Sequence, residues 1–268
     1  MGISLETDLI YDVGLHNGDD TAYYLSQGYR VIGIEADSTL VDNARERFSQ
    51  EIKQGRLKLL NVAIGAEEGT GQFWVCDNVR EWNSFDKAVA SRMGMRHHSV
   101  EVKCRPFSKV LQEHGVPYYL KVDIEKHDHL CVGAIDPDDQ PRYVSVEFDT
   151  FEDLIALRRA GYNAFKVIHQ SPVFGFRQFH ADNAAIPEKG HCGLDAVPWH
   201  KPQTRPGPSG PFGENTHGKW DNFEETAYHL LSFLLGRSSH GNPPDWFIWF
   251  DIHATKLASI RPVRPLYD

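Results

Sequence analysis

Residues 9 to 19 are Leu9-Ile10-Tyr11-Asp12-Val13-Gly14-Leu15-His16-Asn17-Gly18-Asp19, and this stretch decides the fold. Its first five residues are mostly apolar and end at a glycine, which predicts a buried β-strand over 9–13. A turn containing Gly14 and Gly18 follows, and a helix is expected from Asp19 to Gln27, ended by Gly28. A strand, a glycine turn and a helix in this order form the opening unit of an α/β sheet.

The same alternation continues along the chain. Leu40, Ala44 and Phe48 recur every four residues, which predicts a helix with Asp37 or Ser38 as its N-cap. A second helix is expected up to Ala160, capped by Asp149 or Thr150. With the strand at 9–13, further strands predicted over 31–35, 56–62, 118–124, 143–148, 164–168 and 246–250 make seven. This order predicts a mostly parallel, doubly wound, seven-stranded sheet.

Two regions depart from this regular pattern. Residues 72–75 and 100–104 alternate and are expected to form a small antiparallel pair, whereas 77–98 shows no clear pattern. Residues 171–211 are rich in Pro, Gly and His, and a helix ended by Gly236 is expected beyond them. We interpret 171–245 as a Pro-rich insertion before the last strand, a lid or ligand-binding segment within a single domain spanning 1–268. Three aromatic side chains of this segment could stack on a flat ring or simply pack within it: Trp199, Phe212 and Trp220.

Composition excludes several classes of protein. The 268 residues carry 28 basic and 37 acidic side chains, a net charge of -9, which disfavours a nucleic-acid partner. The four cysteines are scattered without a C-x-x-C pair, as expected in a reducing compartment. No secretory signal is visible, and no apolar run approaches the roughly 20 residues of a membrane span. We therefore expect no membrane partner and a cytoplasmic location.

An acidic residue ends the second predicted strand. Glu35 stands 23 residues after Asp12, about one strand-helix-strand step, where an acid hydrogen-bonds the ribose hydroxyls of an adenosine ligand. The glycine spacing Asp12-x-Gly14-x-x-x-Gly18 differs from the G-x-G-x-x-G of dehydrogenases and is typical of S-adenosylmethionine enzymes. The glycine turn by itself could also be only a turn. The residues expected to hold this cofactor are Asp12, Gly14, His16, Asn17, Gly18, Thr21, Glu35, Ala36, Asp37, Ala63 and Asp123.

These features resemble the FkbM family of methyltransferases over about residues 8 to 165. The resemblance implies a Rossmann-like class I methyltransferase fold, S-adenosyl-L-methionine as cofactor and methyl transfer to a hydroxyl of a sugar or natural product. The family often has glycine after its signature glutamate, where this chain has Lys126-His127-Asp128. The segments that carry the resemblance are Asp12-Val13-Gly14, Asn17-Gly18-Asp19, Ile34-Glu35-Ala36, Leu120-Lys121-Val122-Asp123-Ile124-Glu125 and Val144-Ser145-Val146-Glu147.

Charged residues alternate with apolar ones in the signature. Lys121, Asp123 and Glu125 would be costly in a buried strand unless that strand ends at a polar site. We expect Asp123 near the methionine amine or the transferring methyl, with Glu125 and His127 at the mouth, facing a small-molecule or glycan acceptor. The alternative is that Lys121 and Glu125 only pair or are solvated at the strand end.

His127 is the first candidate for the base that removes the proton of a hydroxyl acceptor, because imidazole titrates near neutrality. Asp123, Glu147 and His253 are second choices. Asp149 and Asp251 could join Asp123, Glu125 and His253 as metal ligands, but no compact ligand spacing supports a metal. Two other functions stay open: a nicotinamide-dependent oxidoreductase, which the missing third glycine disfavours, and a non-catalytic cofactor-binding protein.

Overall fold

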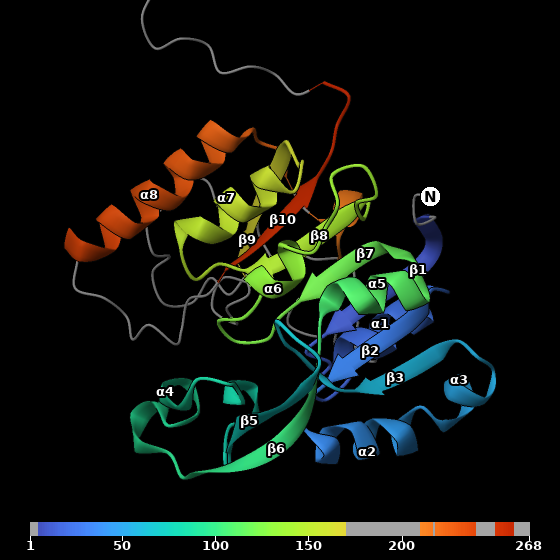
Figure 1. Ribbon diagram of the computed structural model, residues 1–268. Helices are drawn as coiled ribbons and strands as arrows, with labels where there is room; N and C mark the ends of the chain where they lie inside the picture. Colours follow the sequence, from blue (N-terminus) through green and yellow to red (C-terminus); the bar gives the residue numbers. More distant parts are fainter. Residues whose placement is uncertain (1–4, 170–209, 217, 240–249, 260–268) are drawn as a thin grey trace, which may run out of the picture. The chain divides into compact units, whose positions relative to one another are not determined.

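The computed structural model describes residues 5–169, 210–216, 218–239 and 250–259 (Figure 1). The chain divides into two compact units, residues 1–142 and 143–268. Much of the predicted insertion at 171–245, including Trp199, lies outside the described residues. A single methyltransferase domain over 1–268 stays a prediction.

Four parallel strands form the main sheet of the first unit. They are β1 (Leu5–Val13), β2 (Arg30–Glu35), β3 (Leu57–Asn61) and β7 (Val116–Val122), in the order β3-β2-β1-β7. Val13 is in register with both Ile34 and Val122, so three strands end side by side. The chain winds outward from β1 to β3 and then returns to the other side of β1. Such a reversal marks the switch point where ligands bind in open α/β sheets.

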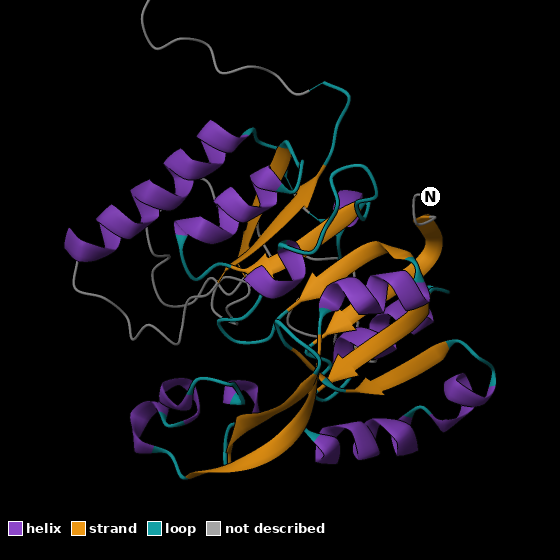
Figure 2. Cartoon of the chain, in the orientation of Figure 1, coloured by secondary structure: helices purple, strands orange, loops and turns teal. Residues whose placement is uncertain are grey.

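Helices follow the strands of this sheet, as Figure 2 shows. Asp37 is the N-cap of α2, because its carboxylate accepts a hydrogen bond of 2.9 Å from the amide of Thr39. This confirms one of the two predicted caps. The helices of the first unit that follow or precede these strands are α1 (Asp19–Ser26), α2 (Ser38–Arg47), α3 (Ser49–Lys53), α5 (Phe107–His114) and α6 (His129–Val132).

A smaller sheet lies between β3 and β7 in the sequence. It contains β4 (Ala63–Ile64), β5 (Gly69–Cys76) and β6 (His97–Arg105), in the order β4-β6-β5. Strands β5 and β6 are antiparallel, as predicted, and β4 adds an unpredicted parallel strand. Between β5 and β6, residues 77–96 form a segment that we call the excursion. Its short helices are η1 (Arg80–Trp82), α4 (Lys87–Ala90) and η2 (Arg92–Gly94).

The second unit contributes three more strands of the predicted seven. Strand β10 (Phe250–Thr255) lies between β8 (Tyr143–Glu147) and β9 (Ala164–His169) and is antiparallel to both. Its helices are α7 (Phe151–Arg159), capped by the side chain of Thr150, η5 (Gly213–Asn215) and α8 (Phe223–Ser239). The α/β class and the seven strands of a mostly parallel sheet are thereby confirmed.

Several predicted boundaries need correction. The signature strand ends at Val122, so Asp123 and Glu125 lie in a loop. Helix α8 does not end at Gly236 but continues to Ser239. On this helix Leu231 is 48% exposed, whereas the neighbouring Leu230 is buried. The last strand begins at Phe250, and residues 246–249 lie outside the described residues.

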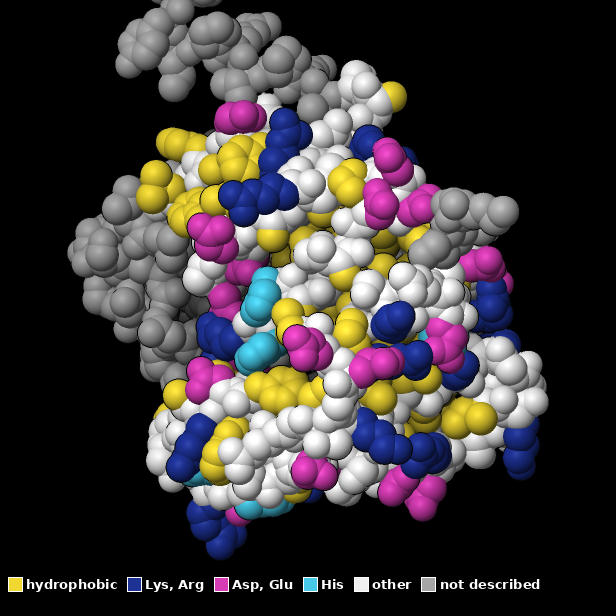
Figure 3. Space-filling view, in the orientation of Figure 1, with side chains coloured by type: hydrophobic (Ala, Val, Ile, Leu, Met, Phe, Trp, Pro, Cys, Tyr) yellow, Lys and Arg dark blue, Asp and Glu magenta, His cyan; other side chains and the backbone are white. Residues whose placement is uncertain are grey.

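The surface mixes charges of both signs. On the face shown in Figure 3, Lys and Arg side chains alternate with Asp and Glu side chains over the first unit. This mixture gives a polyanion no continuous basic track on that face. No helix in the part of the chain that the structure describes is long and apolar enough to cross a membrane.

Candidate functional site

The turn after β1 is packed against the ends of both neighbouring strands. The amides of Gly14 and Leu15 donate to the carbonyl of Ile34 at 2.9 and 3.1 Å. Gly14 has φ +83°, and a Cβ there would lie 1.9 Å from the carbonyl oxygen of Asp123. Glycine is therefore required because the end of β7 approaches the turn, and this close approach could not be predicted from the sequence.

The second glycine of the turn has a different neighbour. Gly18 has φ +79°, and a Cβ would lie 2.7 Å from the ring of Phe48. Next to it, the exposed Asn17 accepts from the amide of Asp19 at 2.9 Å and so fixes the start of α1. The backbone of His16 has a left-handed conformation, with φ 51°, and its amide donates a hydrogen bond to the Glu35 carboxylate.

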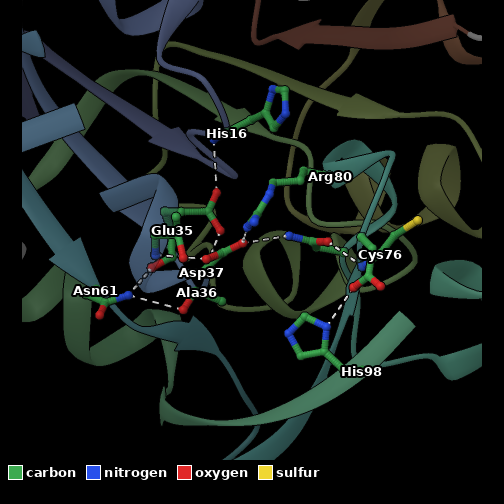
Figure 4. A network of polar contacts seen from close by, with 11 residues as sticks. His16, Glu35, Ala36, Asp37, Asn61, Cys76, Arg80 and His98 are labelled. Carbon is green, nitrogen blue, oxygen red and sulfur yellow. Dashed lines mark hydrogen bonds and ion pairs between the residues drawn. The ribbon is translucent and has the colours of Figure 1, made fainter. Parts of the chain in front are cut away.

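Glu35 is held by two backbone amides at the end of β2 (Figure 4). One carboxylate oxygen accepts from the amide of His16 and the other from the amide of Asp37, both at 2.9 Å. Burial raises the pKa of Glu35 to about 6, although these two hydrogen bonds lower it. Each carboxylate oxygen has more than one acceptor position, so both can still accept from a second donor.

Asp37 connects β2 to the excursion. Besides capping α2, its carboxylate pairs with Arg80 and accepts from the Asn83 side chain at 3.1 Å. From β3, the Asn61 amide group donates to the carbonyls of Glu35 and Ala36 at 3.0 and 3.1 Å. These three partners were not predicted. Asn61 stands at the end of a predicted strand and offered a signal, whereas Arg80 and Asn83 lie in the stretch without a pattern.

Two small apolar residues, Ala36 and Ala63, lie beside this polar network. Ala63 is buried in a cluster of the smaller sheet, and Ala36 packs against the same cluster. The structure thus brings together Glu35, Ala36 and Ala63, which the sequence placed at the ends of different strands. The combination of an acid and an apolar wall matches the two sides of an adenosine group, a diol and a flat base.

A buried ammonium group connects the ends of β1 and β7. The Lys121 nitrogen lies 3.3 Å from Asp12, 3.5 Å from Asp20 and 3.7 Å from Asp123, and donates to the Gly14 carbonyl at 3.1 Å. Burial alone would lower the pKa of Lys121, but the three carboxylates raise it well above its usual value. Lys121 is therefore a cation, and neither its role nor that of Asp20 was predicted.

The side chains of Asp12 and Thr21, before and after the turn, are hydrogen-bonded to each other. The Thr21 hydroxyl donates to Asp12 at 2.7 Å, and both side chains are fully buried. Asp123 differs, since its side chain is 40% exposed. Of the carboxylates around Lys121, Asp123 is the one that can meet a ligand directly.

The loop after β7, residues 123–128, is held by contacts on several sides. Asp128 accepts from the amide of Ile124 at 2.9 Å, and the Ser84 hydroxyl donates to the carbonyl of Glu125 at 3.0 Å. The Glu125 carboxylate pairs with Arg92 at 3.2 Å. Lys121 and Glu125, whose pairing was the stated alternative, have different described partners: Glu125 pairs with Arg92 and Lys121 with Asp12.

His127 lies beside the excursion. Its ring meets Phe85 edge-on at 5.5 Å between centroids, and Nδ1 lies 3.2 Å from the carbonyl oxygen of Glu125. A carbonyl oxygen only accepts, so Nδ1 must carry the proton of this hydrogen bond. In the neutral ring the lone pair is then on Nε2.

A family model described as "Methyltransferase FkbM domain" matches residues 12–166, more than half of the chain. The chain belongs to the FkbM methyltransferase family. The match covers the glycine turn, Glu35, the loop 123–128 and the chain as far as β9. The resemblance inferred from the sequence motifs is thereby confirmed.

Two solved structures are similar to the FkbM chain. Methyltransferase FkbM from Methylobacillus flagellatus KT is 17% identical, with a TM-score of 0.39, over 58% of this chain and 37% of that one. This chain therefore spans little more than a third of the length of that protein. Precorrin-6y C5,15-methyltransferase from Geobacter metallireducens GS-15 is 8% identical, with a TM-score of 0.39, over 95% of this chain and 82% of that one. No curated protein matches the chain.

The residues at which the chain departs from the family signature have an unusual backbone conformation. Lys126, where the FkbM family often has glycine, is left-handed with φ 76°, and so is Glu125 with φ 47°. Glycine adopts this region without steric cost. The backbone at Lys126 is thus in a region that glycine adopts more readily than lysine.

Other candidates for catalysis and binding lie in the second unit. Burial lowers the pKa of His253 to about 3, helped by Lys166, so this ring stays neutral and enclosed. Glu147 ends β8 in register with Asp251. Phe212 and Trp220 both pack against Tyr143, which is the packing alternative stated for them. Within the described residues, no group of three His, Cys, Asp or Glu could hold a metal ion.

Proposed function

We propose that this FkbM-family chain binds S-adenosylmethionine and transfers its methyl group to a hydroxyl oxygen of a small-molecule or glycan acceptor, such as a sugar or natural product. One observation supports the cofactor most strongly. The Glu35 carboxylate is held by the amides of His16 and Asp37 at the switch-point edge of the sheet. A carboxylate fixed in this way is suited to a ribose diol.

The charge around Lys121 supports the same cofactor. Three carboxylates surround one ammonium group, so the cluster is net negative, and its exposed member is Asp123. S-adenosylmethionine carries an ammonium and a sulfonium, both of which such a cluster attracts. Asp123 is therefore proposed to bind the cationic end, and the Gly14 turn to border it.

The bound cofactor supplies a methyl group on an activated leaving group, so the residues mainly align donor and acceptor. His127 is proposed to take the proton of the acceptor hydroxyl at Nε2, since Nδ1 is engaged with Glu125. Glu125 is proposed to act through its carbonyl, because its carboxylate is paired with Arg92.

A cytoplasmic location is part of this proposal. Among the described residues, Cys76, Cys104 and Cys131 are all free thiols, and Cys76 and Cys131 are buried. Free thiols persist in reducing compartments.

A turnover assay tests the proposed activity. The full chain is incubated with S-adenosylmethionine and a panel of hydroxylated acceptors, and S-adenosylhomocysteine is quantified. We expect product only when an acceptor is added, and none with Glu35→Ala. Tight binding of the cofactor without turnover on any acceptor would favour a non-catalytic binder. Binding of NADH in place of S-adenosylhomocysteine would favour the oxidoreductase alternative and contradict the proposal.

A further inference from the structure

We propose that Ser84 is a positioning residue that sets the tautomer of His127 through the carbonyl group of Glu125. The inference rests on the proposed function only for the role of His127 as base. It concerns a residue of the excursion, which the motifs of the sequence did not mark.

Ser84 is fixed on its backbone. Its amide donates to the carbonyl of Trp74 at 3.0 Å, and its carbonyl accepts from the amide of Trp74 at 2.8 Å. Trp74 belongs to β5, so the position of Ser84 is set by the smaller sheet. Ser84 is also completely buried, which excludes water as a competing partner.

The hydroxyl group of Ser84 is fixed as well. Its oxygen accepts from the amide of Asp86 at 3.0 Å, in the turn that starts α4. Its other contact is the carbonyl oxygen of Glu125 at 3.0 Å. Because an amide only donates and a carbonyl only accepts, the hydroxyl proton must point at Glu125.

The carbonyl oxygen of Glu125 has two lone pairs, and two donors to it are described. One donor is Ser84, and the other is Nδ1 of His127 at 3.2 Å. Glu125 lies in a left-handed conformation, with φ 47°, which is unfavourable for a residue with a side chain. A peptide group in such a conformation needs to be held, and the Ser84 hydroxyl contributes to this from the excursion.

This arrangement has a consequence for the reactive nitrogen of His127. A neutral histidine free in water favours the tautomer with its proton on Nε2, which leaves no lone pair there. The Glu125 carbonyl reverses that preference by binding a proton on Nδ1. Ser84 thereby keeps Nε2 available as a base, although Ser84 itself touches no reacting group.

Nitrogen NMR of the histidine side chains tests this chain of contacts. The full protein is labelled with ¹⁵N, and the His127 signals are identified by their absence in His127→Gln. In the neutral ring, we expect the wild type to show a protonated Nδ1 and an unprotonated Nε2. A wild-type His127 that is mainly protonated on Nε2 would overturn the inference without any variant.

The variant Ser84→Ala then tests the effect of removing the Ser84 hydroxyl group. The two ring nitrogens should shift toward the Nε2-protonated pattern, and Ser84→Thr, which keeps the hydroxyl, should restore the wild-type pattern. Ser99→Ala is the matched control, because the substitution keeps the backbone pairing of Ser99 with Trp74, and the exposed Gln72 side chain is the one described donor to the Ser99 hydroxyl. An unchanged His127 tautomer in folded Ser84→Ala would overturn the role of Ser84.

Calorimetry with S-adenosylhomocysteine on the same samples separates this inference from the proposed function. We expect Ser84→Ala to bind it within about twofold of the wild type, since Glu35 and Asp123 are untouched. Absence of binding by the wild type would contradict the proposed function, whereas the tautomer result alone decides the role of Ser84.

Discussion

Two buried lysines, one in each unit, have opposite surroundings. Lys121 is surrounded by three carboxylates, which raise its pKa well above the usual value although burial opposes this. Lys166 donates to the Thr216 carbonyl and hydroxyl and lies 4.4 Å from the Trp220 ring centroid. Burial lowers its pKa, and Glu214 and Asp221 offset this only in part.

The two lysines differ in what they hold in place. Lys121 contacts residues of the proposed cofactor site, whereas Lys166 contacts residues of the second unit's core. Lys121 binds the Gly14 turn and Asp123, which are the parts of the molecule closest to the proposed cofactor. Lys166 joins β9 to the segment at 213–216, and among the described residues its hydrogen-bond partners are neutral. Carboxylate partners, rather than burial itself, therefore distinguish Lys121, the lysine of the proposed site, from Lys166.

Lys121→Met should have the largest effect. It leaves the buried Asp12 and Asp20 without their counter-ion, and breaking such a pair by removing one partner costs about 3–5 kcal/mol. The free energy of unfolding, measured by urea denaturation, gives this cost directly. A loss below about 1 kcal/mol would mean that the cluster is not the buried ion network described.

Lys166→Met is the matched control for that measurement. It removes hydrogen bonds to neutral acceptors but also removes a poorly solvated charge, so the net loss should be about 1 kcal/mol. Equal losses for the two variants would remove the distinction between the two lysines.

The pH dependence of stability tests the surroundings of His253, a buried histidine of the second unit. His253, in register with Lys166, has a folded pKa of about 3, below its usual 6.5. Between these values the unfolded chain binds the extra proton, so stability is lost as the pH falls below 6.5. The loss approaches about 1.4 kcal/mol per pH unit at full slope.

Urea denaturation between pH 7 and 5 measures this slope. His253→Leu should remove this loss and leave the opposite contribution of Glu35, whose raised pKa favours the folded chain as the pH falls through 6. The same loss of stability in His253→Leu as in the wild type would show that other groups cause it.

Lys126→Gly should have the smallest effect, and a favourable one. Relief of the left-handed strain outweighs the added freedom of the unfolded chain, for a gain of about 0.5 kcal/mol. Lys126→Ala is the control and should give no gain, since alanine has the same steric conflict. The midpoint of urea denaturation compares the three proteins, and a gain from alanine would contradict the steric explanation.

The regular part of the molecule could be predicted well from the sequence, because apolar runs reflect buried strands and glycines reflect turns. The strands around Asp12 and Glu35, and the cap at Asp37, follow from such local rules. The pairing of β5 with β6 could be predicted for the same reason.

The contacts of the site were less predictable, because they join residues far apart in the sequence. Lys121 stood in the signature, yet its partners Asp12 and Asp20 lie on another strand and helix. Arg80, Ser84 and Arg92 lie in the excursion, where short 3-10 turns leave no periodic pattern. Their roles can be inferred only from the contacts that they make in the folded chain.

The proposed cofactor site depends on Glu35 binding the ribose of an adenosine group. Calorimetric titration with S-adenosylhomocysteine, for the wild type and Glu35→Gln at pH 7.5 and 5, tests it most directly. Since the pKa of Glu35 is about 6, lowering the pH should protonate the carboxylate and weaken wild-type binding by roughly tenfold at pH 5. Glu35→Gln should bind weakly at both pH values, and equal, pH-independent affinity of the two proteins would contradict the account.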